Sequence, residues 1–334
     1  MNLAYEEQAI NNQHQLTLLL AYLQLHDYRF TTISPASHEK VNNRPQHGMS
    51  NELIDIFGWN RAFKREAVAA QLFDLMQSAN IANKVGDYWK SQLRVSSVNG
   101  LLFLHSAYPT LGNEAVFFGP DSYRFANVIH QFIATNQQPI QRAVDIGTGS
   151  GVGAVVLATA LLTSASEPKP ELEIEIVAVD INSYALSLAR VNTNAADMHN
   201  IALIHSNLLH NVAGNFDLII ANPPYLLDET ERAYRHGGGL LGAALSLAIV
   251  DAAIERLNAN GTLLLYTGVA IVNGQDAFLT ELASKLNLAG FTYEYKEIDP
   301  DIFGEELNGE AYSMVDRIAA VVLTAKKPAE QRPI

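Results

Sequence analysis

The sequence contains no cysteine among its 334 residues. This absence excludes a disulfide scaffold, zinc sites built on thiolates, iron–sulfur clusters and a cysteine nucleophile. Charged residues are also sparse, at 17%, whereas hydrophobic residues reach 48%. That balance is typical of a folded chain with a large core, and it excludes wholesale disorder. The length predicts two domains, or one large domain with an extension.

Long hydrophobic runs are missing as well. No stretch of about 18 apolar residues occurs, and residues 239–250, which come closest, are too short to span a bilayer. The first residues also lack the basic start and apolar run of a signal peptide. The sequence therefore predicts a cytoplasmic protein without a membrane partner.

Positive charge is in short supply, with 22 Lys and Arg against 35 Asp and Glu. The net charge is −1 over residues 1–140 and −12 over residues 141–334. Because an acidic surface repels phosphate backbones, we expect no DNA partner, and we expect any RNA contacts in the first half. Arg61, Lys64 and Arg65 are candidates for such contacts, although a solvated start of a helix is the simpler explanation of this group.

The first third of the chain has the pattern of a small α+β domain. Helices are expected at 5–25, 51–57 and 64–82. Strands are expected at 88–98 and 101–107, on either side of Asn99-Gly100, a strong hairpin signal. Helices followed by a hairpin predict a winged-helix-like domain, which we place at residues 1–115.

Residues 116–334 alternate short apolar strands with helices, which predicts a mostly parallel sheet covered on both faces. The last two strands have no helical pattern between them and are expected to pair antiparallel. Strands are expected at 141–146, 173–179, 201–205, 216–221, 262–267, 291–298 and 317–324. Helices are expected near 123–135, 152–163, 183–195, 240–258 and 275–289.

A glycine-rich segment, DIGTGSG at residues 145–151, follows the first of these strands and opens a helix. Glycines let the backbone turn tightly and approach a ligand without Cβ clashes, and the start of the helix adds unpaired N–H donors. The same residues also satisfy a dinucleotide fingerprint. The segment therefore predicts a site for a nucleotide-like cofactor and leaves its identity open.

An acidic residue, Asp180, closes the next strand, EIVAVD. A carboxylate at that position can accept hydrogen bonds from both ribose hydroxyls of an adenosine-containing ligand. A solvated strand end or a helix N-cap is the alternative role for this residue.

The sequence Asn222-Pro223-Pro224-Tyr225 comes directly after the apolar strand FDLIIA. Its prolines remove two N–H donors, fix the backbone and leave their carbonyls as acceptors. An amide oxygen, a rigid carbonyl and an aromatic face together suit a planar amino group. Hydrogen bonds from that group to the amide and carbonyl oxygens draw its lone pair out of conjugation and direct it at an electrophile.

These three segments, in this order, resemble class I S-adenosylmethionine-dependent methyltransferases that methylate nitrogen. Within that class the sequence is most similar to the small-domain group, the HemK/PrmC-type glutamine methyltransferases and the rRNA and tRNA amino-group methyltransferases. The resemblance covers about residues 118–324 and implies a Rossmann-like sheet. The segment HGGGLLG at 236–242 is similar to a glycine-rich segment of the HemK-like enzymes.

The resemblance implies a role for each matching residue. Asn222, Pro223 and Tyr225 are the predicted catalytic residues, which bind the target amino group. Asn207 stands where many relatives carry Asp against the adenine amino group, and its carbonyl accepts the same N–H. S-adenosylmethionine is the expected cofactor and no metal is expected. The predicted cofactor-binding residues are Asp145, Gly147, Gly149, Gly151, Asp180 and Asn207.

The leading hypothesis is methyl transfer from S-adenosylmethionine to a planar amino nitrogen on a macromolecule, selected by residues 1–115. The HGGGLLG segment favours a protein glutamine amide, whereas the extra N-terminal domain favours an rRNA or tRNA base. A catalytically silent binding module is a further alternative. A nicotinamide-dependent oxidoreductase leaves Asn222-Pro223-Pro224-Tyr225 unexplained, and the spacing from Asp145 to Asp180 exceeds the usual value of about 20 residues.

Overall fold

The computed structural model describes residues 3–45, 52–110, 112–164, 174–228, 232 and 234–329, without the side chains of 3–9, 164 and 240. The chain forms two compact units. The first comprises residues 1–124, 149–152 and 184–199, and the second comprises residues 125–148, 153–183 and 200–334. A functional boundary at residue 115 stays a prediction.

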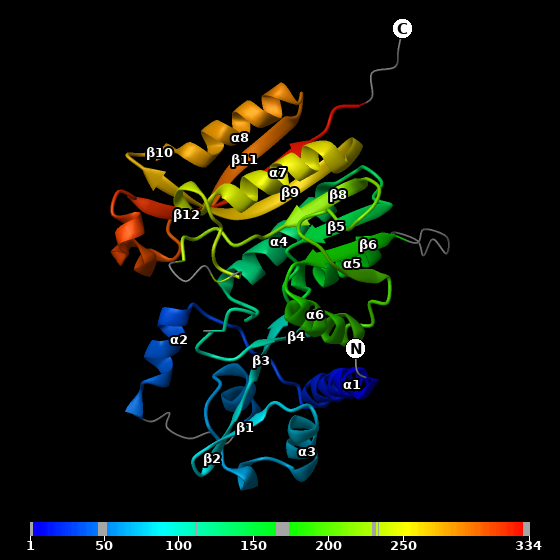
Figure 1. Cartoon of the computed structure of the whole chain (residues 1–334), viewed down its shortest axis with the longest axis vertical. Coiled ribbons are helices and arrows are strands. Elements are labelled where there is room, and N and C mark those ends of the chain that lie inside the picture. Colours follow the sequence, from blue (N-terminus) through cyan, green and yellow to red (C-terminus); the bar gives the residue numbers. More distant parts are fainter. Residues whose placement is uncertain are drawn as a thin grey trace. The chain divides into compact units, whose positions relative to one another are not determined.

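The first unit is α+β, as predicted, and contains two hairpins (Figure 1). Val98 pairs with Leu101 across the predicted turn, where Asn99 and Gly100 have φ values of 51° and 84°. The elements up to the second hairpin are α1 (Leu3–Leu25), α2 (Pro35–Asn42), the π-helix η2 (Ile54–Gly58), η3 (Arg65–Ala67), α3 (Ala70–Ser78), β1 (Ala82–Val85), β2 (Tyr88–Ser91), β3 (Leu93–Val98) and β4 (Leu101–Ser106).

Two predictions for this unit are wrong in detail. The helix expected over 64–82 is confined to α3, because Asn80 adopts a left-handed φ of 58° that ends the helix. The chain then forms β1, which pairs with β2 around Gly86, a second hairpin that we did not predict. The strand expected over 88–98 is therefore divided between two separate sheets. The likeness to a winged helix stays a prediction.

The second unit contains a sheet whose main path has the order β11-β12-β9-β8-β5-β6-β7. The pairs from β7 to β9 are parallel, and β12 is antiparallel to both of its neighbours. The prediction of a mostly parallel, Rossmann-like sheet with an antiparallel last strand is confirmed. The strands are β5 (Arg142–Ile146), β6 (Glu175–Asp180), β7 (Ile201–His205), β8 (Phe216–Ala221), β9 (Leu257–Val272), β10 (Gln275–Asp276), β11 (Thr292–Asp299) and β12 (Arg317–Lys326).

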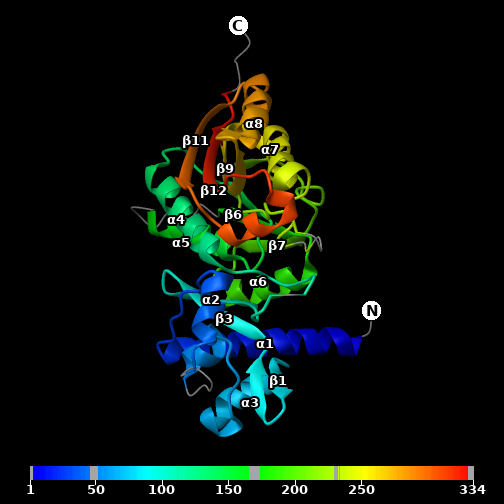
Figure 2. The same cartoon turned by 90° about the vertical axis from the view of Figure 1, so that its left-hand side faces the viewer.

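Helices cover both faces of this sheet, with α7 and α8 on one face and α4 and α5 on the other (Figure 2). Apolar side chains of α7 and α8 complete the buried core against β5, β6, β8, β9 and β12. The expected start of α7 was four residues too early, because Leu241 and Gly242 have positive φ values. The remaining elements are α4 (Pro120–Thr135), α5 (Val152–Ser164), α6 (Ser183–Ala195, of which 184–195 belong to the first unit), η4 (Leu240–Gly242), α7 (Ala244–Arg256), α8 (Ala277–Leu288), η5 (Gly304–Asn308) and η6 (Glu310–Tyr312).

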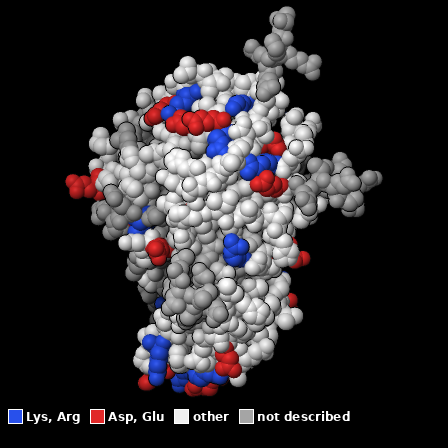
Figure 3. Space-filling view, turned by 45° about the vertical axis from the view of Figure 1, so that its right-hand side comes forward, with Lys and Arg blue, Asp and Glu red and all other residues white. Residues whose placement is uncertain are grey.

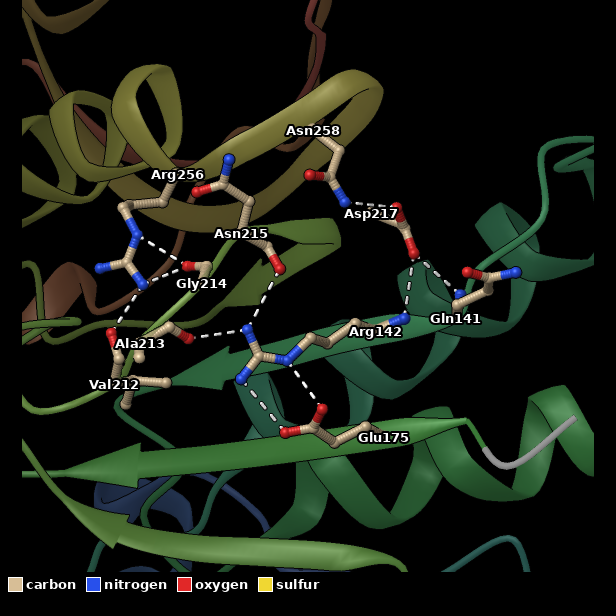
Figure 4. A network of polar contacts seen from close by, with 10 residues as sticks. All are labelled: Gln141, Arg142, Glu175, Val212, Ala213, Gly214, Asn215, Asp217, Arg256 and Asn258. Atoms are coloured by element: carbon tan, nitrogen blue, oxygen red, sulfur yellow. Dashed lines mark hydrogen bonds and ion pairs between the residues drawn. The ribbon is translucent and has the colours of Figure 1, made fainter.

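A polar network fastens the amino edge of this sheet, where the parallel strands begin (Figure 4). Arg142 donates hydrogen bonds to Glu175 and to two backbone carbonyls of the β7–β8 loop, at 2.8 and 3.2 Å. Arg256 donates to three further carbonyls of the same loop. Both guanidinium groups lie over the ring of Phe216, at 4.6 and 5.9 Å from its centroid. The network therefore ties the loop that carries Asn207 to the start of the sheet.

Candidate active site

The carboxyl ends of the parallel strands bring several predicted site residues of the second unit to one edge of the sheet. Ile146, which ends β5, pairs with Val179 of β6 and with Ala221, which ends β8. The chain continues from β5 through β6 to β7 on one side, and β8 then lies on the other side of β5. Ligands of open α/β sheets bind beside such a reversal of strand order. The predicted residues at this edge are Gly147, Asp180, Asn207 and Asn222.

The glycine loop begins at this reversal. Gly147 and Gly149 have positive φ values of 72° and 55°, and a Cβ added to either meets no described atom within 4 Å. The loop is anchored because the N–H groups of Gly147 and Thr148 both donate to the carbonyl of Val179, at 2.9 Å. Gly147 thus leaves space beside an anchored backbone, which is the property expected of a ligand loop, whereas Gly149 is counted with the first unit.

Gly151, the third predicted glycine, lies in the stretch counted with the first unit and has a packing role. Its φ is 84°, and an added Cβ would lie 3.2 Å from the Cβ of Ala189 on α6. Tight contact with a helix explains the absence of a side chain at this position. Direct contact between Gly151 and a cofactor stays a prediction.

Asp145 lies beneath the loop and is 1% exposed. Its carboxylate accepts hydrogen bonds from the Thr148 hydroxyl at 2.6 Å and from the Ala154 N–H at 2.9 Å. Burial raises the pKa of this carboxyl to about 7, the two hydrogen bonds oppose the rise, and the Asp180 carboxylate adds to it. Asp145 therefore connects the loop to the start of α5. Gly153, which we did not predict, allows this contact, since its added Cβ would lie 2.7 Å from the Asp145 carboxylate.

Asp180 is half-buried at the end of β6, and one of its carboxylate oxygens accepts the N–H of Asn182 at 2.9 Å. Ile181, the next residue, is 54% exposed, and its carbonyl accepts a hydrogen bond from the His205 ring. The sequence analysis missed Ile181. The signal was an apolar residue directly after a strand-closing acid, which offers a flat apolar surface beside a carboxylate.

Asn207 is exposed in the turn after β7. Its carbonyl accepts the N–H of His210 at 3.2 Å, and Leu208 has a left-handed φ of 48°. The side-chain amide makes no hydrogen bond with any described residue. A contact between this amide and an adenine stays a prediction.

Asn222 and Pro223 begin the segment after β8. Asn222 is half-buried, and its side chain makes no hydrogen bond with any described residue. Pro223 is buried, and Ala221, the last residue of β8, is completely shielded from solvent. Asn222 therefore follows a buried strand end, and the N–H groups and the oxygen of its side-chain amide are available to a ligand.

Tyr225 is 6% exposed, because glycines of the HGGGLLG segment pass close to its backbone. A Cβ added to Gly237 would lie 2.7 Å from the Cα of Tyr225, and one added to Gly242 would lie 2.7 Å from its carbonyl carbon. The segment is tied to residue 226, since the N–H of Gly237 donates to the Leu226 carbonyl at 2.8 Å. The structure thus explains these glycines by close backbone packing.

The loop between β11 and β12, residues 300–316, also reaches this segment. Its Phe303 ring lies 6.0 Å from that of Tyr225, at an interplanar angle of 69°. Glu306 forms an ion pair with Arg235, and the Tyr312 hydroxyl accepts the N–H of Leu227 at 2.8 Å. The sequence analysis found no helical pattern between the last two strands and assigned these residues no role. Sequence separation concealed its contact with the candidate acceptor site.

Within the described ranges, no group of three or more His, Asp or Glu side chains is placed to hold a metal ion. The helices of those ranges also include none that is long and apolar enough to cross a membrane.

Residues 126–288 match the model of the family described as methyltransferase small domain. A release factor glutamine methyltransferase of Lactococcus lactis is 28% identical over 38% of this chain and 47% of its own length. One of Borreliella burgdorferi is 32% identical over 25% of this chain and 34% of its own length. The chain thus spans about half or less of the length of these curated relatives.

Solved structures also match. The crystal structure of an M. jannaschii tRNA m1G37 methyltransferase superimposes with a TM-score of 0.46 at 16% identity, covering 72% of this chain and 58% of the other. Residues 126–288 thus match a methyltransferase small domain, and this chain is similar to class I S-adenosylmethionine-dependent methyltransferases related to the HemK/PrmC group.

Proposed function

We propose that this protein transfers a methyl group from S-adenosylmethionine to a glutamine side-chain amide of a protein substrate. The observation that carries the proposal is the half-buried Asn222 amide, which follows β8 at the reversal of strand order and bonds to no described residue. The amide therefore keeps its donors and its acceptor open at the edge where open α/β sheets bind ligands, which suits recognition of a substrate.

The second unit fits the cofactor at this edge. Gly147 leaves space at its missing Cβ, Asp180 places a carboxylate at the end of β6, and Ile181 exposes an apolar surface beside it. Asp180 suits the ribose hydroxyls, Ile181 suits a face of the adenine, and Asn207 suits its amino group. When bound, S-adenosylmethionine supplies an electrophilic methyl group on a sulfonium.

The residues after β8 suit the acceptor nitrogen. The Asn222 amide oxygen and the Pro223 carbonyl each accept one N–H of the substrate amide. These bonds direct the nitrogen lone pair toward the methyl group, while Tyr225 supports the planar group. Such catalysis rests on orientation and on fixed dipoles, and the methylated nitrogen loses its extra proton to water.

Two observations support a protein substrate. The curated relatives include release factor glutamine methyltransferases and a protein N5-glutamine methyltransferase of Methanocaldococcus jannaschii, named as putative, which is 48% identical over 46 residues. Residues 141–334 carry a net charge of −12, which opposes binding of a polyanion. On the face drawn in Figure 3, the Lys and Arg of the described residues are interspersed with Asp and Glu.

The first unit is the proposed selector of that substrate, since the second unit already contains the proposed amino-group site. Among the basic residues singled out in the sequence, Arg61 forms an ion pair with Asp55 and Arg65 lies 4.2 Å from the centroid of the Phe73 ring. Two of these three basic residues thus already contact other side chains of the first unit, which weakens the case for a phosphate-binding patch.

One labelling experiment tests the acceptor class. Purified protein is incubated with methyl-labelled S-adenosylmethionine and an extract of cells that lack the gene, and parallel samples are treated with RNase and with protease. We expect label that survives RNase and is lost with protease. The reverse pattern identifies an RNA acceptor and refutes the protein substrate, whereas saturable cofactor binding without labelling of either class indicates a silent binding module.

A further inference from the structure

Gly268 lies on β9, 43 residues after Tyr225 in the sequence, and its missing side chain accommodates the Tyr225 ring. A Cβ added at Gly268 would overlap Cδ2 and Cε2 of that ring and would lie 3.0 Å from its Cζ. Unlike the loop glycines, Gly268 is absent from the residues with positive φ. Backbone conformation therefore does not explain this glycine, whereas space for the aromatic ring does.

Neither the Gly268 backbone nor the Tyr225 backbone can shift easily to relieve such an overlap. Gly268 pairs with Ala320 of β12, and the preceding Thr267 bonds through its hydroxyl to Ser246 of α7 at 2.8 Å. On the other side, Gly237 and Gly242 approach the Tyr225 backbone closely. With both backbones held, an added methyl group at 268 forces the ring itself to rotate.

Phe303 restricts rotation of the Tyr225 ring from another side. The two rings are nearly perpendicular, with centroids 6.0 Å apart, a favourable edge-to-face arrangement. Phe303 holds a left-handed φ of 51°, which is costly for a bulky side chain and persists where surrounding contacts impose it. The loop contacts of Glu306 and Tyr312 with the 225–236 segment supply that constraint.

We propose that Gly268 is a positioning residue for methyl transfer, because it sets the orientation of the Tyr225 ring, with Phe303 holding that orientation from the β11–β12 loop. This inference rests on the proposed function, in which Tyr225 supports the acceptor amide. Gly268 acts through Tyr225 and touches neither substrate nor cofactor. A methyl group at 268 therefore disturbs the acceptor step and leaves the cofactor site at Gly147 and Asp180 intact.

The test compares Gly268→Ala with the wild type and with Gly112→Ala, whose added Cβ meets no atom of the described residues closer than 3.9 Å. We expect kcat for labelling of the extract to fall at least tenfold in Gly268→Ala. The Kd for S-adenosylhomocysteine, measured by calorimetry, stays within twofold of the wild-type value. Gly112→Ala leaves both quantities unchanged. Wild-type kcat in Gly268→Ala, or an equal loss of cofactor affinity, overturns the inference.

A double-mutant cycle with Tyr225→Ala tests the route of the effect without an activity assay. Removing the ring empties the space that the new Cβ would occupy. Gly268→Ala should therefore lower the unfolding midpoint in urea much less in the Tyr225→Ala background than in the wild type. If Gly268→Ala alone fails to fold, recovery of folding in the double variant supports the inference. Equal destabilisation in both backgrounds, or a double variant that stays unfolded, refutes it.

Phe303→Leu provides an independent check on the loop. Leucine keeps an apolar contact and loses the perpendicular ring, so we expect a smaller fall in kcat, about threefold, with unchanged Kd for S-adenosylhomocysteine. An unaltered kcat removes Phe303 from the inference. Failure of the proposed function has a different signature, since the wild type would then label RNA, or would bind S-adenosylhomocysteine and label nothing.

Discussion

The two edges of the central sheet contrast in how their polar groups are used. At the amino edge, the guanidinium groups of Arg142 and Arg256 hold backbone carbonyls of one loop, and Asp217 accepts N–H groups from residues 141 and 142. At the carboxyl edge, the side chains of Asn207 and Asn222 bond to no described residue, and glycines leave space. Polar groups at the amino edge therefore stabilise the sheet, whereas those at the carboxyl edge are available to bind a ligand.

This contrast has a physical basis. Hydrogen bonds and cation–aromatic contacts between protein groups at the amino edge stabilise the fold, whereas a polar group reserved for a ligand adds nothing to stability until the ligand binds. Changes at the carboxyl edge should therefore alter function more than stability, and changes at the amino edge should do the reverse. The predictions below test that division, from the largest expected effect to the smallest.

The largest effect is expected for Asn222→Ala. Loss of the amide that orients the acceptor should lower kcat by roughly 100- to 1,000-fold, the range found for loss of one preorganised hydrogen-bonding group. Calorimetry should show unchanged affinity for S-adenosylhomocysteine, and the urea midpoint should stay near the wild-type value. An active Asn222→Ala enzyme removes the central claim about this residue.

Asp180→Ala should act on the cofactor instead. Two ribose hydrogen bonds to a charged acceptor are lost, each worth about 1.5–3 kcal/mol, so affinity for S-adenosylhomocysteine should fall at least about 100-fold. Asn207→Ala is the matched comparison, with a smaller loss because a neutral amide accepts one bond. Tight binding of NAD to the wild type, without binding of S-adenosylhomocysteine, contradicts the cofactor assignment.

Arg256→Ala probes the amino edge. Carbonyls of Leu209, Val212 and Gly214 lose their donor, and we expect a loss of about 1–3 kcal/mol in the free energy of unfolding, measured by urea denaturation. Cofactor affinity should be unchanged. Lys285→Ala is the control, since its ion pair with Asp251 is partly exposed and contributes at most about 1 kcal/mol. A selective loss of cofactor affinity in Arg256→Ala breaks the division between the edges.

The last effect is a gradual pH dependence of stability from Asp145. Its pKa is raised from 3.8 to about 7 in the folded protein, chiefly by burial, so the folded state holds this proton more tightly than the unfolded state. The stability that this carboxyl contributes is present below about pH 4 and is lost as pH rises toward 7. Asp145→Asn should flatten that part of the profile in urea denaturation between pH 4 and 8. Parallel profiles for the two proteins contradict the assignment.

The alternation of strands and helices in residues 116–334 was predictable because each element carries a strong local signal. Apolar runs such as FDLIIA are buried on both faces of a parallel sheet, and the predicted strands all exist. Strand ends were less predictable. β9 extends over 16 residues because pairing with β12 continues it beyond its apolar centre, and pairing is a property of the partner.

In the first unit, a helical pattern in the sequence continued beyond the helix that forms. Residues 64–82 have helical spacing of apolar positions, yet Asn80 ends the helix and the hairpin of β1 and β2 begins directly afterwards. The Asn99-Gly100 turn was predictable because its left-handed conformations favour those two residues. A turn that requires particular residues can thus be predicted from the sequence. The end of a helix that is followed by a short strand depends instead on the packing around it.

The sequence by itself determined the residues of the candidate site that follow strands, namely the glycine loop, Asp180 and Asn222, because each lies with its preceding strand in one short contiguous segment. Only the tertiary structure decided that Asp145 is buried and serves the loop, and that Gly268 and Phe303 enclose Tyr225. Gly268 comes from β9 and Phe303 from the β11–β12 loop, and both are distant from Tyr225 in the sequence. Their roles arise from close packing between separate segments, and packing of that kind leaves no periodic or local pattern in a sequence.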